Sequence, residues 1–247
     1  MMRHRLVPLV LLLTASACSV APPVESPPAT AIDRLVARVV AAYGGRDALA
    51  RLGTSRTIAT VTPHVRHLGG AGRTVRHFAA PDRLRVEIIY PAKTEVRILN
   101  GEQGWRGDAR SVTPVEGPAI VAMRSQLLRM QPAWTLFHHR DHLTLGETSV
   151  RDGTRHRTLR LAWSNELAMD YAVEEATGRV TVVDARLQFG RTLMTFATEY
   201  SEFETVDGAL VPMVEENYAA DRHTATTRIE SVALGVGDLG PFTGPHQ

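Results

Sequence analysis

The chain has 247 residues, of which 44% are hydrophobic and 22% are charged, and it contains a single cysteine. This composition is typical of a globular protein with a sizeable core, and one thiol excludes an internal disulfide and a cysteine-based zinc site. The formal net charge is only +2, and no basic stretch is interleaved with aromatic residues, so we expect no nucleic acid partner.

The start of the chain has the pattern of a secretory signal. Arg3 and Arg5 form a positive region, residues 6–13 form an apolar run too short to span a bilayer, and residues 15–17 are small. Cleavage falls either at an ordinary small residue or directly before Cys18. The sequence ASAC resembles the lipobox of bacterial lipoproteins, and this resemblance implies that Cys18 carries a diacylglycerol on its sulfur and an acyl chain on its amine. Several such chains anchor a protein stably to a membrane.

Residues 19–30, SVAPPVESPPAT, contain four prolines and predict an extended tether that reaches roughly 35 Å. The same composition also fits an ordinary disordered tail. Ser19 stands where lipoproteins of the inner membrane typically have Asp, so the resemblance implies the periplasmic side of the outer membrane. We therefore predict a signal over 1–17, a lipidated cysteine and tether over 18–30, and one domain over 31–247.

The domain is predicted to open with a helix. Thr30 and Asp33 have the spacing of a capping box, and apolar residues then recur at helical intervals until Gly44 and Gly45. A short helical turn over 46–52 follows. No later apolar run is long enough to cross a membrane.

From Thr54 onward apolar and polar residues mostly alternate, which is typical of half-buried antiparallel strands. Glycine-containing turns at 69–72, 100–104 and 206–208 separate several of these segments. One helix interrupts them, because Pro118 can open a helix and Pro132 can stop it. We expect about five strands before this helix and about six after it.

These elements predict a mainly β protein. Two helices cannot cover both faces of so large a sheet, so we expect an unclosed antiparallel β-barrel, or a strongly curved sheet, of about 11 strands. The N-terminal helix and the central helix, which would act as a lid, are placed in its concave side. An imperfect fit between the helices and the sheet would leave an apolar cavity.

Five segments occur in an order that resembles the LolA/LolB-like family of lipoprotein-sorting and lipid-carrying proteins. They are GGRDAL at 44–49, APDRLRVEI at 80–88, NGEQGW at 100–105, VRDGTRHRTLRL at 150–161 and EYSEFETVDGALVP at 199–212. The resemblance implies an unclosed β-barrel with a helical lid and a cavity for acyl chains. One departure concerns Ala80, which precedes Pro81 where carriers of this family have an arginine that latches the lid to the barrel.

Other motifs carry weaker signals. His138, His139 and His142 lie within five residues, but a zinc site normally needs three or four ligands with orienting partners, so we predict no metal site. GVGDLG at 235–240 leaves no room for a dinucleotide-binding fold, and RGD at 106–108 is read as chance. We find no catalytic constellation and therefore predict no enzyme activity and no cofactor.

The predicted function is a non-catalytic, membrane-anchored periplasmic carrier or acceptor that binds a lipid or an acylated lipoprotein. The alternative is a cell-envelope sensor or interaction module of the same fold, with a packed core and a protein partner. The predicted cavity residues are Leu84, Val86, Ile88, Val96, Ile98, Trp105, Ile120, Met123, Leu127, Met130, Met169 and Tyr171. Inward-facing apolar rows are more often solid core than cavity, and the family resemblance is what favours a cavity here.

Overall fold

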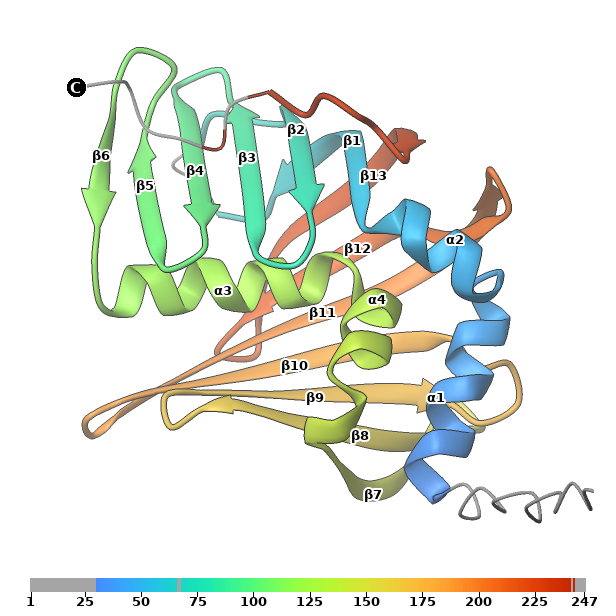
Figure 1. Cartoon of the computed structure of the whole chain (residues 1–247). Helices are drawn as coiled ribbons and strands as arrows, with labels where there is room; N and C mark the ends of the chain where they lie inside the picture. The colour runs from blue at the N-terminus through green and yellow to red at the C-terminus, as the bar shows by residue number, and fades with distance from the viewer. Residues whose placement is uncertain (1–29, 66–67, 241, 243–247) are drawn as a thin grey trace, which may run out of the picture.

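The structure is a computed structural model that describes residues 30–65, 68–240 and 242 (Figure 1). Within these residues, thirteen strands form one antiparallel sheet in the order β6-β5-β4-β3-β2-β1-β13-β12-β11-β10-β9-β8-β7. The end strands β6 and β7 do not pair, so the sheet is not closed into a barrel. The prediction of a mainly β, unclosed antiparallel sheet is confirmed.

The helices and strands of the described residues have the following bounds. The helices are α1 (Ala31–Ala42), α2 (Gly45–Leu52), α3 (Pro118–Met130), α4 (Pro132–His138) and the short 3-10 helix η2 (Arg140–His142). The strands are β1 (Thr54–Pro63), β2 (Gly72–Ala79), β3 (Arg83–Ile89), β4 (Thr94–Asn100), β5 (Gln103–Gly107), β6 (Val112–Val115), β7 (Leu143–Arg151), β8 (Thr154–Ser164), β9 (Leu167–Glu174), β10 (Val180–Phe189), β11 (Thr192–Val206), β12 (Ala209–Ala219) and β13 (Arg222–Leu234).

The N-terminal helices begin and end where the sequence predicts. The Thr30 side chain accepts a hydrogen bond from the Asp33 backbone N–H at 3.1 Å, and the Asp33 carboxylate accepts one from the Thr30 N–H at 2.9 Å. Gly44 separates α1 from α2 with a φ of +93°, and a Cβ there would lie 2.0 Å from the Gly208 carbonyl oxygen. Only glycine fits this position, which brings the helix junction against the turn between β11 and β12.

The structure has two more strands than the sequence predicts. The first half of the domain ends in β6, a four-residue edge strand that contains Pro114 and therefore carries a weak strand signal. In the second half, the turn between β12 and β13 uses Ala220 and Asp221, both at positive φ, in place of glycine. Pro132 also begins α4 rather than simply ending the central helix.

The helices lie on the concave side of the curved sheet (Figure 1). On this side a large apolar core joins α1, α2, α3 and α4 to the inward rows of the sheet. The inward rows of β8 to β10 are fully packed, and their members include Leu159, Leu161, Met169, Tyr171, Val183 and Leu187, each at most 1% exposed.

The outer face of β4 is also covered, and this corrects one prediction. Val86 pairs directly with Arg97, so Val96 and Ile98 lie on the opposite face of the sheet from Val86. There they pack with the C-terminal Leu239 and Phe242, and Trp105 and Val112 join them. The prediction that Val96, Ile98 and Trp105 line the cavity is therefore wrong, because the register between β3 and β4 decides which face of the sheet these residues occupy.

No helix among the described residues is long and apolar enough to cross a membrane. The predicted signal over 1–17, Cys18 and nearly all of the tether over 18–30 lie outside the described residues.

Candidate functional site

A cavity of about 390 Å³ lies between α3 and the concave faces of β1–β4, β12 and β13. One part of its wall is apolar and consists of Val61, Pro63, Val65, Leu68, Val86, Ile88, Tyr90, Ala122, Phe196, Ala219 and Ala225. The other part is polar and includes Thr74, Arg76, Glu95, Arg97, Gln126, Arg129, Asn217, Tyr218, Thr224 and Thr227. The cavity is therefore amphipathic, whereas the sequence predicts an apolar one.

Strand register produces this mixed wall. In the β2–β3–β4 part of the sheet, Arg76 pairs with Val86, and Val86 pairs with Arg97. Residues that pair directly share a face, so this row places one apolar side chain between two arginines. The neighbouring row follows the same rule, because Ile88 pairs with Glu95 on one side and with Thr74 on the other.

An ion pair spans the concave side from β2 to β12. Arg76 Nη1 donates to both carboxylate oxygens of Glu215, at 2.8 and 2.7 Å, and the two side chains are only 11% and 8% exposed. Strands β1 and β13 lie between β2 and β12 in the sheet. A contact across two intervening strands requires the sheet to curl strongly at this point, so the pair fixes the curvature of the cavity wall.

Glu95 belongs to a second charged group in the wall. Its carboxylate accepts from Lys93 Nζ at 2.6 Å and from Arg97 Nη2 at 2.8 Å. Burial by itself raises the pKa of Glu95, but the hydrogen bond from Lys93 and the charge of Arg97 hold that pKa below its usual value. Glu95 is therefore ionised at neutral pH.

Arg129 is the charged residue that α3 contributes to the cavity wall. Its Nη1 donates to Thr198 Oγ1 at 2.9 Å, and its guanidinium lies 5.7 Å from the ring centre of Phe196. Burial lowers the pKa of Arg129 from its ordinary value, but the group stays protonated. The Tyr200 hydroxyl donates to the Arg129 carbonyl oxygen at 2.6 Å, and burial raises the pKa of this tyrosine.

The charges of this wall do not balance. The wall contains three guanidinium groups, Arg76, Arg97 and Arg129, and two carboxylates, Glu95 and Glu215. The difference is one positive charge in a partly desolvated space. An anionic or strongly polar group entering the cavity would be attracted to this wall.

The structure divides the predicted cavity residues into three groups. Val86 and Ile88 line the cavity, and Met130 borders an adjoining space of about 50 Å³ beside Arg76 and Glu215. Leu84, Met123, Leu127, Met169 and Tyr171 are buried in the main core, and Ile120 packs against it. The third group consists of Val96, Ile98 and Trp105, which lie on the outer face.

The orientation of α3 explains this division. Met123 and Leu127 point into the core and are 4% and 1% exposed. From α3 the cavity is lined by Ala122, Gln126 and Arg129. These residues share a side of the helix, and Ala122 and Gln126 come directly before Met123 and Leu127 in the sequence. The amphipathic pattern of the helix predicts which side is most apolar, and that side packs against the core rather than against the cavity.

The central helix is fastened to the sheet by its own arginines. Ala80, which replaces the arginine of the family pattern, packs against the core. Arg124 of α3 donates from Nη2 to the Gly101 carbonyl oxygen at 2.5 Å, and its guanidinium lies 5.4 Å from the ring centre of Trp163. Together with Arg129, Arg124 holds the helix against both parts of the sheet.

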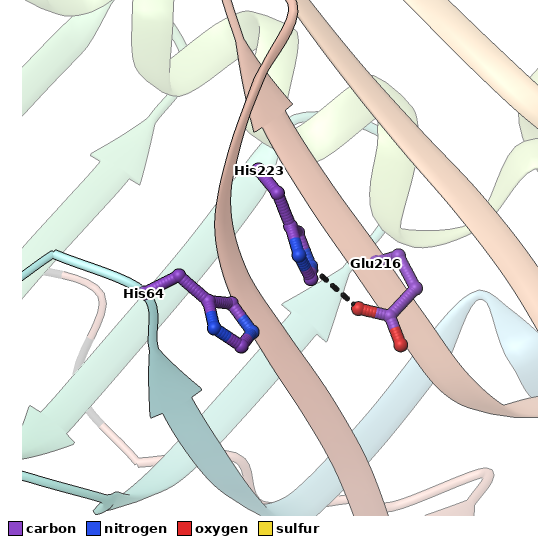
Figure 2. Close-up of side chains that lie close together, drawn as sticks. All are labelled: His64, Glu216 and His223. Carbon is purple, nitrogen blue, oxygen red and sulfur yellow. Dashed lines mark hydrogen bonds and ion pairs between the residues drawn. The ribbon is translucent and has the colours of Figure 1, made fainter.

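The histidines near the end of α4 have structural contacts. The His138 ring stacks on Trp134 with ring centres 4.0 Å apart, and its Nδ1 lies 3.0 Å from the Trp134 carbonyl oxygen. His139 packs edge-on against Trp163, and burial lowers its pKa. A different group, His64, Glu216 and His223, brings potential metal ligands together (Figure 2). No pattern in the sequence indicates this group, because Glu216 lies 152 positions after His64.

Comparison of the sequence with known family models and with curated proteins gives no match. Several solved structures share the fold, among them the following three. The chain is 14% identical to a LolA superfamily protein from Nitrosomonas europaea, with 83% of this chain and 94% of that chain covered and a TM-score of 0.52. A protein of the DUF1329 family from Desulfovibrio piger is 17% identical, with 86% and 95% covered and a TM-score of 0.52.

The third structure is a domain from Vibrio parahaemolyticus described as an outer membrane lipoprotein-sorting protein. It is 10% identical, 83% of this chain and 92% of that chain are covered, and the TM-score is 0.51. Identities this low show the fold alone. The predicted resemblance to LolA-like proteins is confirmed at that level.

Proposed function

Because the chain has a LolA-like fold, we propose that it is a membrane-anchored periplasmic carrier or acceptor that holds part of a lipid or an acylated protein in the cavity beneath α3. The observation that carries this proposal is the amphipathic cavity itself. Its volume of about 390 Å³ falls in the usual range of small-molecule sites. The membrane anchor would be the lipidated Cys18, and the location would be the outer membrane.

The two parts of the cavity wall suit the two parts of an amphiphile. The apolar part, around Val61, Leu68 and Ile88, would bury methylene groups, each worth about 0.8 kcal/mol. The polar part, with Arg97 and Arg129, would face a polar or anionic head group. This arrangement supports a ligand that is only partly enclosed, with the remainder of its acyl chain leaving through the mouth.

In this proposal the charged side chains of the wall bind and orient the ligand. Glu95 is held by Lys93 and Arg97, and Arg76 is paired with Glu215. Arginine side chains can donate hydrogen bonds to a head group without transferring protons.

A second candidate is an interaction module of the cell envelope. The observation that favours it is the tight packing of the predicted lid face, since Met123 and Leu127 leave no space between α3 and the core. A partner would then bind through sheet edges or through the concave rim. The two candidate functions differ in whether the cavity binds an acyl chain.

Filling the cavity tests the proposal. Ala122 lies on the cavity side of α3, and Ala122→Trp would place an indole in the space proposed for the ligand. We expect binding of a fluorescent fatty acid to fall at least tenfold, with little change in melting temperature. The matched control is Ala37→Trp on the exposed side of α1, which is expected to bind as the unmodified chain does.

Mass spectrometry of organic extracts from the natively purified chain would identify the bound molecule. If the unmodified chain binds no fatty acid and carries no lipid, the carrier proposal is wrong and the interaction module is favoured. Equal binding by both tryptophan variants would place the ligand elsewhere.

A further inference from the structure

Three side chains with metal-binding atoms meet beside the turn between β12 and β13 (Figure 2). His64 directly follows β1, Glu216 belongs to β12, and His223 belongs to β13. Their potential ligand atoms all lie within 4.8 Å of one another. His223 Nε2 is 2.7 Å from Glu216 Oε2, and the centres of the two imidazole rings are 4.0 Å apart.

Neighbouring groups hold these side chains in place. Thr226, which pairs with Glu216 across the hairpin, donates from its hydroxyl to Glu216 Oε2 at 2.6 Å and lies 3.0 Å from His64 Nε2. The His64 backbone N–H donates to the Thr224 carbonyl oxygen at 2.8 Å. On the other side, the Tyr218 ring stacks on His223 with ring centres 5.0 Å apart. Each of the three candidate ligands is therefore oriented by at least one contact.

A simple ion pair explains only part of this arrangement. The contact between Glu216 and His223 satisfies one carboxylate and one imidazole. His64 adds a second imidazole at close range that this ion pair does not use. A cation bound to both neutral rings and to the carboxylate would use all three groups.

We propose that His64, Glu216 and His223 form a binding site for Zn²⁺ or a similar nitrogen-binding divalent cation. Two imidazoles and one carboxylate are an established zinc ligand set, whereas Mg²⁺ and Ca²⁺ prefer oxygen ligands alone. Zinc bonds of about 2.0–2.2 Å bring ligand atoms to about 3.3 Å from one another in a tetrahedral site. All three side chains are exposed or half-buried, so small rotations can bring them to that spacing.

The position of the site gives the ion a structural role. Each ligand is adjacent in sequence to a residue of the cavity wall: Pro63 precedes His64, Asn217 follows Glu216, and Thr224 follows His223. A bound ion would tie the end of β1 to the β12–β13 hairpin on the outside of this wall. These three residues would bind the ion whether or not the cavity carries a lipid.

Titration of the untagged full chain with Zn²⁺ tests the site. The chain should carry Cys18→Ala, which removes its one thiol, and should first be stripped of metal with a chelator. Calorimetry is expected to show one Zn²⁺ per chain, and Zn²⁺ should raise the melting temperature whereas Mg²⁺ should not. Co²⁺ is expected to give the visible absorption of a four-coordinate site.

Variants locate the binding. His64→Ala and His223→Ala are each expected to weaken Zn²⁺ binding about 100-fold, and Thr226→Val, which keeps all three ligands, about tenfold. The control His142→Ala changes an exposed histidine outside the site and should bind normally. Circular dichroism of the metal-free variants checks that each is folded. Absence of stoichiometric binding, or binding that persists when His64 and His223 are both changed, would overturn the proposal.

Discussion

The concave side of the sheet has two regions built from the same alternating strands. Across β8, β9 and β10 the inward residues are apolar, and side chains such as Leu159 and Tyr171 are completely buried. Across β2, β3 and β4 the inward rows mix Val86 and Ile88 with arginine, glutamate and threonine. The first region forms a solid core with α1 and α4, and the second keeps a cavity beneath α3.

The difference shows that a cavity in this fold depends on polar side chains in the inward rows. Apolar side chains pack until little space remains, because each buried contact is favourable. Charged side chains must keep their partners, as Arg76 keeps Glu215 and Arg97 keeps Glu95, and these pairs stop the helix from settling onto the sheet.

Truncating a buried side chain should give the largest difference in stability loss between the packed region and the cavity region. Leu159→Ala removes a fully buried side chain from the packed region and is expected to cost about 2–5 kcal/mol of stability. Ile88→Ala at the cavity wall, where the side chain is half-buried, should cost about 1 kcal/mol. Denaturant unfolding measures both values. Equal losses would mean that the wall is packed as tightly as the core.

Breaking the ion pair between β2 and β12 tests whether charge holds the cavity wall in shape. Glu215→Leu leaves Arg76 without its partner in a nearly buried position, and we expect a loss of about 2–4 kcal/mol, less than for a fully buried pair. The double variant Arg76→Met with Glu215→Leu removes both charges and should recover most of that loss, as measured by thermal unfolding. Because the pair also curves the cavity wall, the double variant should reduce binding of a fluorescent fatty acid. Unchanged binding would mean that the pair only stabilises the fold.

Enlarging a side chain on the core side of α3 is expected to cost less stability than truncating Leu159 or breaking the ion pair. Met123 is 4% exposed and packs in the core, so Met123→Trp should overpack this region and cost about 1–3 kcal/mol. Differential scanning calorimetry measures the loss. If Met123→Trp leaves the stability unchanged while fatty-acid binding disappears, the acyl chain lies on the Met123 side of α3 and the cavity beneath Ala122 is not the site.

Local features of the fold follow from the sequence alone. The capping box of Thr30 and Asp33 begins α1, Gly44 separates α1 from α2, and Pro118 begins α3, because each depends on residues a few positions apart. Alternation of apolar and polar residues likewise predicts antiparallel strands and an open, curved sheet. These patterns also predict that Val86 and Ile88 face inward, since they lie on one strand with period two.

Tertiary structure decides which side chains of neighbouring strands share a face and which of them line the cavity. Val96 and Ile98 alternate as regularly as Val86 and Ile88, yet the pairing of Val86 with Arg97 turns them to the outer face, where Leu239 and Phe242 cover them. A register is a relation between two strands, and no pattern within one strand contains it. The same holds for His64, Glu216 and His223, which meet only because β1 and β12 both pair with β13 in the sheet.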